Sequence, residues 1–170
     1  MDAGKGPCCT PEEQLNQLIS QYHTSMLKLC CMLLRDPVAA EDAVQETFLK
    51  AYRGIVSFRG QSSAKTWMTA IALNVCRDMR KSAWARHVEK RVTPEELPIA
   101  APAQDEDALA LGQAIQNLPD KYREAVLLYY YQDMTMQETA KLLKTTPSNI
   151  AKRLDRARTM LRKELEVTLP

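Results

Sequence analysis

The segment 135–165, TMQETAKLLKTTPSNIAKRLDRARTMLRKEL, contains two short helical patterns separated by a tight turn. Thr135 and Glu138 have the spacing of a capping box, which predicts that the first helix begins directly after Thr135. Thr146 followed by Pro147 predicts the start of the second helix, because proline is favoured at the first helical position. A capped helix, a turn and a second, strongly basic helix together indicate a helix-turn-helix, which is a DNA-binding motif.

The second helix of this pair has an apolar face and a basic face. At about 100 degrees per residue, four apolar positions fall on one stripe that we expect to be buried: Ile150, Leu154, Ala157 and Leu161. The opposite side carries the side chains that we expect to contact DNA: Ser148, Asn149, Lys152 and Arg156, flanked by Arg153. Arginine and lysine donate to guanine, asparagine pairs with adenine, and flanking cations bind phosphate. A solvated basic face on an ordinary helical bundle is the alternative interpretation of this helix.

Composition indicates an all-α protein of two small domains. The chain has 170 residues, 45% of them apolar and 26% charged, and runs of β-branched residues are scarce. The net charge is only +2, but no lysine or arginine occurs between Val92 and Asp120, a stretch that is rich in acidic residues. We therefore predict a disordered N-terminus over 1–10, a domain over 11–91, a flexible acidic linker over 92–107 and a helix-turn-helix domain over 108–168.

Several functional classes lack support in the sequence. The five cysteines form adjacent pairs or stand alone and show no CxxC spacing, which argues against a disulfide framework and against a structural zinc site. No signal-peptide core and no apolar run of about 20 residues occurs, so we expect a cytoplasmic protein without membrane insertion. Paired catalytic carboxylates, a phosphate-binding glycine loop and a nucleophile with a base are also lacking. We expect no enzymatic activity, no cofactor or metal, and no small-molecule substrate.

The first half predicts three helices. The first begins with a capping box at Thr10 and Glu13, the second begins at Asp36 and Pro37, and the third runs from about 64 to 83. The second helix carries a polar, mostly acidic group of residues: Glu41, Asp42, Gln45 and Glu46. This group could also be no more than a solvated helix face.

The third helix has a core face and a basic face. Trp67, Ile71 and Val75 fall on the face that we expect to be buried. The other face is basic and amide-bearing, with a leucine that we expect to be exposed, and it carries Thr69, Leu73, Asn74, Arg77 and Arg80.

Six segments resemble the sigma-70 family of bacterial RNA polymerase subunits, specifically its small extracytoplasmic-function class. In the first half, 42–52 (DAVQETFLKAY) resembles the family's polymerase-clamp-binding helix, and 58–62 (FRGQS) with 66–74 (TWMTAIALN) resembles its promoter-melting and minus-ten-reading segment. In the second half, 118–126 (LPDKYREAV), 136–143 (MQETAKLL) and 148–158 (SNIAKRLDRAR) resemble its minus-thirty-five-reading domain. The resemblance covers nearly the whole chain and implies a sigma factor.

The resemblance also implies roles for the faces described above. The acidic group on the second helix would bind core RNA polymerase at the beta-prime clamp, and the family also contacts the beta flap. Minus-ten DNA would be bound and melted by Phe58, Arg59, Trp67, Thr69, Asn74, Arg77 and Arg80. Asn74 matches the position near which an unstacked base is captured. Promoter DNA and an anti-sigma factor are the further expected partners.

Some residues depart from the family pattern or allow another role. Lys144 stands at the turn where the family often has glycine, and Asp155 places an acid on the DNA side. Trp67 is most simply a core residue, although it can be both core and functional. A helix-turn-helix regulator that acts without polymerase is the alternative function. It would explain 135–165 but would leave 42–52 and 58–74 without a role.

Overall fold

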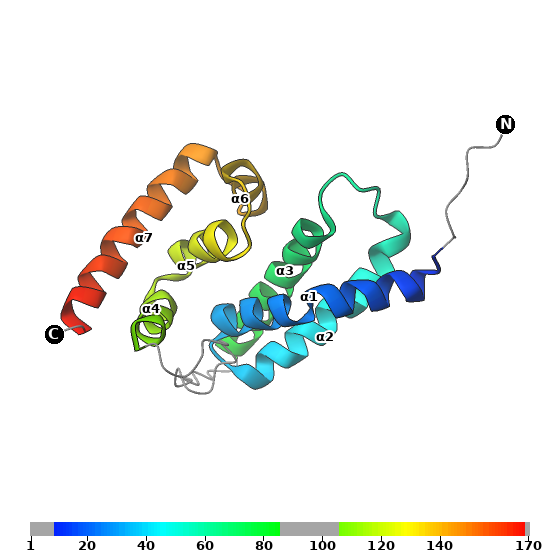
Figure 1. Ribbon diagram of the computed structural model, residues 1–170, viewed down its shortest axis with the longest axis horizontal. Helices are drawn as coiled ribbons and strands as arrows, with labels where there is room; N and C mark the ends of the chain where they lie inside the picture. Colours follow the sequence, from blue (N-terminus) through cyan, green and yellow to red (C-terminus); the bar gives the residue numbers. More distant parts are fainter. Residues whose placement is uncertain (1–8, 86–105, 169–170) are drawn as a thin grey trace.

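The structure is a computed structural model that describes residues 9–85 and 106–168 (Figure 1). The first domain contains α1 (Pro11–Leu34), α2 (Pro37–Gly54), the 3-10 turn η1 (Ile55–Ser57) and α3 (Ala64–Ala85). The second contains α4 (Glu106–Asn117), α5 (Asp120–Val126), the π-helical turn η3 (Leu127–Tyr131), α6 (Met136–Leu142) and α7 (Pro147–Thr168). No strand occurs among the described residues, and the all-α prediction is confirmed.

Two predicted features fall outside this part of the chain. The N-terminal residues expected to be disordered lie outside the described residues, except for the last two. Most of the acidic linker also lies outside them, and its final two residues, Glu106 and Asp107, form the acidic first turn of α4.

The helices begin where their capping residues predict. Thr10 and Thr135 each form a capping box, with Glu13 and Glu138 respectively returning a side-chain contact to the cap backbone. The Asp36 carboxylate accepts from the first backbone N–H groups of α2. These caps satisfy backbone donors that have no partner within the helix, so they fix the start of α1, α2 and α6.

The apolar stripe of α7 is buried as predicted. Ile150, Leu154 and Ala157 are each 1% exposed or less, and Leu161 packs at their edge. They face α4, α5 and α6, which together cover one side of α7 (Figure 1). The opposite side of α7 is left to solvent, which positions its basic residues.

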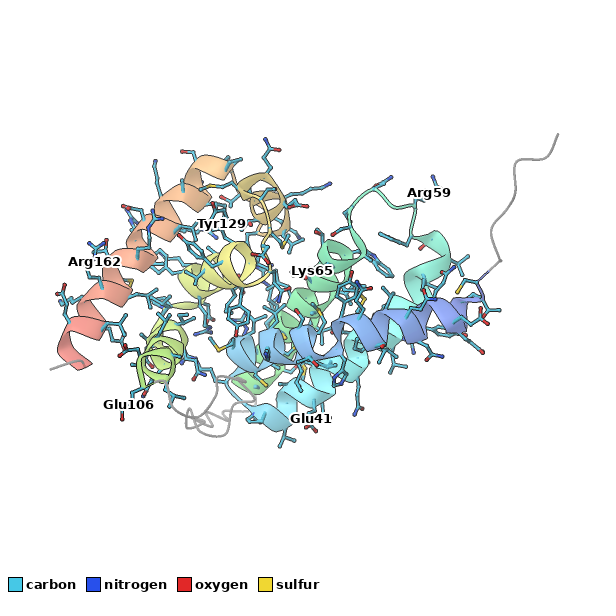
Figure 2. The ribbon with its side chains drawn as sticks, in the orientation of Figure 1. Glu41, Arg59, Lys65, Glu106, Tyr129 and Arg162 are labelled. Atoms are coloured by element: carbon cyan, nitrogen blue, oxygen red, sulfur yellow. The ribbon has the colours of Figure 1, made fainter. Side chains whose placement is uncertain are left out.

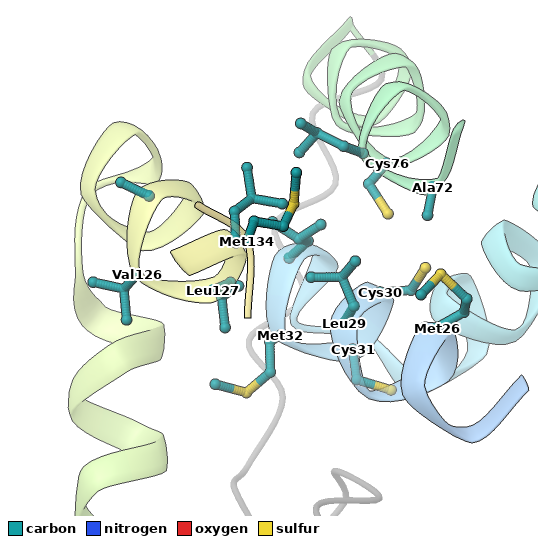
Figure 3. Close-up of a cluster of buried hydrophobic side chains, with 14 of the residues drawn as sticks. Met26, Leu29, Cys30, Cys31, Met32, Ala72, Cys76, Val126, Leu127 and Met134 are labelled. Atoms are coloured by element: carbon teal, nitrogen blue, oxygen red, sulfur yellow. The ribbon is translucent and has the colours of Figure 1, made fainter. Parts of the chain in front are cut away.

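The two domains pack against each other and share one continuous apolar core. Figure 3 shows Leu29 and Met32 of α1 beside Leu127 and Met134 of the second domain, and all four are at most 4% exposed. The side-chain amide of Gln116 approaches the Met32 sulfur at 3.9 Å across this contact. The helix-turn-helix domain is therefore seated on the first domain through α1 and α3.

This packing corrects one expectation for α3. Leu73, which we expected to be exposed on the basic face, is only 1% exposed and belongs to the continuous core. The reason is that the second domain covers the stripe of α3 on which Leu73 lies. Periodicity alone assigned that stripe to solvent because most of its residues are polar.

The described cysteines are free thiols, as expected. Cys30 and Cys76 point toward each other in the core between α1 and α3 (Figure 3). Their mutual hydrogen bond and burial raise the pKa of the Cys30 thiol, and burial raises the pKa of Cys31 to about 11. Both thiols stay protonated at neutral pH, which favours a packing role.

Candidate nucleic-acid interface

The predicted recognition residues of α7 form one solvent-facing surface. Ser148, Asn149, Lys152 and Arg156 are exposed and Arg153 is half-buried, all within the first turns of the helix. The Thr146 hydroxyl accepts from the Asn149 backbone N–H at 3.2 Å, and the Asn149 amide donates to the Thr145 hydroxyl at 3.1 Å. The N-terminal part of α7 is thereby capped and its polar side chains are held at the turn.

Two tyrosines border this surface that sequence reasoning missed. The Arg156 guanidinium donates to the Tyr122 hydroxyl, and this contact holds the pKa of Tyr122 below its usual value. Arg158 donates to the Tyr130 hydroxyl at 3.0 Å and pairs with Asp155 at 3.6 Å. Asp155, the acid that departs from the family pattern, is therefore partly neutralised by its own neighbour on the helix.

The turn between α6 and α7 is closed by backbone hydrogen bonds. Thr145 N–H donates to the Ala140 carbonyl at 2.9 Å and Lys144 N–H donates to the Lys141 carbonyl at 3.3 Å. This pair of bonds is a Schellman motif, in which the residue at the Lys144 position is most often glycine. Lys144 adopts a φ of 51°, so the left-handed conformation is kept although the side chain is not glycine.

The loop before α3 forms a hollow around two stacked aromatic rings. The rings of Phe58 and Trp67 lie 4.5 Å apart at an interplanar angle of 22°. The hollow has a volume of about 410 Å³ and is lined by Gly54, Ser57, Phe58, Arg59, Gln61, Ser62 and Trp67. A Cβ at Gly54 would lie 3.2 Å from the Trp67 ring, so glycine lets the ring rest against the end of α2. The structure thus brings together three of the predicted minus-ten residues.

The predicted residues further along α3 are divided between solvent and the second domain. Asn74 is exposed, whereas Thr69 is completely buried. Arg77 contacts the Glu124 carboxylate through Nε at 3.2 Å and Nη2 at 2.6 Å, and Arg80 donates to the same carboxylate at 2.6 Å. In this conformation Thr69, Arg77 and Arg80 are not available to DNA.

Glu124 is held as a buried carboxylate by these two arginines. It is 5% exposed, and burial raises its pKa, but the hydrogen bonds from Arg77 and Arg80 outweigh burial and leave the pKa below its usual value. Asp120 pairs with Arg80 at 3.1 Å and also with Arg123, whose pKa burial lowers to about 10. Sequence reasoning missed Glu124 and Asp120 because nothing in their own segment shows which helix they face.

The predicted polymerase-binding residues lie on α2 beside an apolar groove. Glu41, Asp42 and Gln45 are exposed, and Glu46 pairs loosely with Lys50 at 3.9 Å. The groove lies between α1 and α2, has a volume of about 670 Å³ and is lined by Glu12, Leu15, Asn16, Ile19, His23, Val44, Gln45, Phe48, Leu49 and Tyr52. Figure 2 shows Glu41 of α2, Arg59 of the loop before α3 and Arg162 of α7 on separate parts of the molecule.

The described residues include neither a metal-binding cluster nor a candidate membrane-spanning helix. Among residues 9–85 and 106–168, no group of three or more histidine, cysteine, aspartate or glutamate side chains could hold a metal ion. Within the same ranges no helix is both long and apolar enough to span a bilayer.

Comparison with known proteins gives matches to both halves of the chain. The family model of Sigma-70 region 2 matches residues 18–86, and that of Sigma-70 region 4 matches residues 108–161. The ECF RNA polymerase sigma factor SigM of Mycobacterium tuberculosis is 31% identical, over 86% of this chain and 74% of its own length. The ECF RNA polymerase sigma factor SigW of Bacillus subtilis is 29% identical, over 91% of this chain and 90% of its own length.

Solved structures share the arrangement of helices. The sigma factor RpoE of Bartonella quintana, solved with the anti-sigma factor NepR, superposes with a TM-score of 0.78 at 24% identity, over 91% of this chain and 98% of that one. CnrH, solved with the cytosolic domain of CnrY, gives a TM-score of 0.68 at 22% identity, over 92% of this chain and 90% of that one. At these identities the likeness shows the fold. Together with the sequence matches, it places the chain in the sigma-70 family, among its extracytoplasmic-function members.

Proposed function

We propose that this protein binds core RNA polymerase and directs it to the promoters of a specific set of genes, where it starts transcription. The observation that carries this proposal is the exposed basic face of α7, on a chain whose first domain also presents an acidic α2 and an aromatic hollow. DNA binding alone would need only α7. Core polymerase resides in the cytoplasm, so we expect the protein to act there.

The basic face of α7 is the proposed minus-thirty-five contact. In this proposal Arg156 and Lys152 donate to base edges in the major groove, and Asn149 pairs with adenine. Arg153, which flanks this face, would bind phosphate and so set the register of the helix on the duplex. The Tyr122 hydroxyl lies beside Arg156, whose guanidinium lowers the pKa of Tyr122.

The hollow around Phe58 and Trp67 is the proposed site of strand opening. A base that leaves the stack loses a few kcal/mol, and stacking on an aromatic side chain returns about 1–3 kcal/mol. Arg59 stands exposed at the rim of the hollow, where it can meet a backbone phosphate, and Asn74 is exposed further along α3. No ATP is required, because melting would draw on binding energy.

The exposed polar residues of α2 are the proposed core-polymerase contact. Glu41, Asp42, Gln45 and Glu46 would meet the basic coiled coil of the beta-prime clamp, and the second domain would contact the beta flap. The RpoE relative was solved with an anti-sigma factor, and we propose that a separate anti-sigma protein controls this chain too.

Run-off transcription on genomic DNA with purified core polymerase tests the proposal. We expect specific transcripts only when the protein is added. If the protein footprints DNA by itself but never supports initiation, it is instead a helix-turn-helix regulator that acts without polymerase.

Arg156→Ala tests the assignment of the recognition face. We expect promoter binding by the polymerase complex to weaken by about 1–3 kcal/mol at a promoter that depends on its minus-thirty-five element. Arg162→Ala is the matched control, since Arg162 is an exposed arginine of the same helix beyond the recognition turns. Equal effects of the two variants on binding would contradict the assignment.

A further inference from the structure

One stripe of α3 faces the second domain along its whole length. Its residues recur every three or four positions, which places them on a single side of the helix: Thr66, Thr69, Leu73, Arg77 and Arg80. Leu73 and Thr69 are fully buried in the middle of the stripe, and the arginines close one end. Leu73 is the one apolar residue of this stripe. The second domain therefore covers a mostly polar surface, which water would solvate well if the first domain stood by itself.

The second domain meets this stripe with acidic side chains. Glu124 accepts hydrogen bonds from both arginines, and Asp120 forms an ion pair with Arg80 at 3.1 Å. At the other end, Glu138 accepts from the Thr66 hydroxyl at 3.4 Å, and Asp133 lies 3.7 Å from Lys65. A row of oxyanions against hydroxyl and cationic side chains is the same chemistry that a nucleic-acid backbone presents.

The contact at Glu124 is stronger than an ordinary surface ion pair. Its carboxylate is 5% exposed and accepts three hydrogen bonds from two guanidinium groups, two of them at 2.6 Å. Charge-assisted, bidentate contacts of this kind are among the strongest in proteins. The ion pair of half-buried Lys65 with exposed Asp133 adds little in comparison. Beside this cluster, Met32 and Leu127 bury apolar surface between the domains.

We propose that the second domain is a built-in competitor for the minus-ten strand, and that the Glu124 carboxylate takes the place of a backbone phosphate on Arg77 and Arg80. The inference rests on the proposed function, and on the minus-ten contact that the family resemblance implies for those two arginines. In the conformation of this structure, called the closed form, the second domain covers the proposed DNA-binding stripe of α3. The two domains must separate before this stripe can bind a DNA strand. The recognition face of α7 remains exposed in the closed form, so masking acts on one of the two promoter contacts only.

Glu124→Gln tests the proposal, because it removes the charge and keeps the shape of the side chain. We expect a larger radius of gyration in small-angle scattering. We also expect the affinity of the free protein for a fluorescent oligo-dT strand to rise about tenfold, which corresponds to the smallest free energy measured for hydrogen bonds to charged groups. Oligo-dT is a suitable probe because the arginines would contact the backbone and not the bases. Glu166→Gln, an exposed glutamate of the same domain, controls for the change in net charge and should alter neither quantity.

A second variant opens the interface without touching the charged cluster. Met32→Glu removes apolar contact between the domains, and we expect it to increase both the radius of gyration and the oligo-dT affinity. Circular dichroism identifies any variant that has lost its helices.

The outcomes separate this proposal from the proposed function. An open Glu124→Gln variant with unchanged oligo-dT affinity overturns the competition, as does a variant that stays closed. Failure of the wild-type protein to support run-off transcription would overturn the sigma-factor function, whatever Glu124→Gln does.

Discussion

Lys144 holds the turn of the helix-turn-helix at a conformational cost. A left-handed backbone costs an L-residue about 1–2 kcal/mol, and glycine avoids this but loses about 0.5–1 kcal/mol of chain entropy on folding. With Lys144 at φ 51°, we expect Lys144→Gly to raise the free energy of unfolding by roughly 0.5–1 kcal/mol. Urea denaturation measures the change. Lys144→Ala is the control and should give no gain, because alanine keeps the Cβ; an equal gain from both variants would contradict the explanation.

Glu124 makes the domain contact sensitive to acid. Its hydrogen bonds from Arg77 and Arg80 leave its pKa below the usual value of 4.5, so the contact is fully present above that pH and is lost as the pH falls through the lowered pKa. Asp120 and Arg123, both on α5, also carry charge at this cluster, and Arg35 at the end of α1 lies near Arg123. We expect the interdomain distance, measured by fluorescence energy transfer, to increase on acidification. The increase should be smaller in Glu124→Gln, and an identical pH profile in the two proteins would exclude Glu124 as the sensitive group.

Individual residues were predictable from sequence where the cause is local. The caps at Thr10 and Thr135 and the buried stripe through Leu154 depend on neighbours within a few positions, so spacing alone predicts them. Leu73 and Glu124 were not predictable in this way. Their burial depends on a helix from the other domain, and no local pattern indicates which face that helix covers.

Among the elements, α3 and the loop before it combine a packing role with the proposed melting role. Sequence periodicity identified the core face of α3, but it did not show that Trp67 stacks on Phe58 over an open hollow. The loop geometry depends on Gly60, at a φ of 68°, and on the close approach of Gly54 to the Trp67 ring. Such contacts join separate segments, so only the folded arrangement reveals them.

Trp67→Ala distinguishes a melting role from a purely structural one. If the ring stacks on an unpaired base, the variant loses about 1–3 kcal/mol of stacking during opening. We expect transcription from a duplex promoter to fall, and a template with a pre-melted minus-ten region to restore most of the activity. Trp67→Phe keeps an aromatic face and should lose less. Equal losses on duplex and pre-melted templates would support the alternative that Trp67 serves only the core.

The whole molecule has two sequence domains but one continuous core. Composition predicted the two helical units, because an acidic stretch without lysine or arginine separates two stretches with helical periodicity. The packing of the units was not predictable. Met32 and Leu127 occupy positions that look like ordinary core positions of their own helices, although each also contacts the other domain. A sequence pattern reports that a side chain is buried and leaves open what covers it.

A shared core predicts that the two domains unfold together. In the wild-type protein we expect tryptophan fluorescence, to which Trp67 of the first domain contributes, and total helicity to give coincident urea transitions. Leu154→Ala removes a side chain buried within the second domain and should cost about 2–5 kcal/mol. Met32→Ala should lower the free energy of unfolding by less, because the domains can separate and water can fill the gap. In this variant the fluorescence and helicity transitions should no longer coincide.

Separate transitions in the wild-type protein would show that the interface does not couple the domains. Coincident transitions in Met32→Ala would show that Met32 does not carry the coupling.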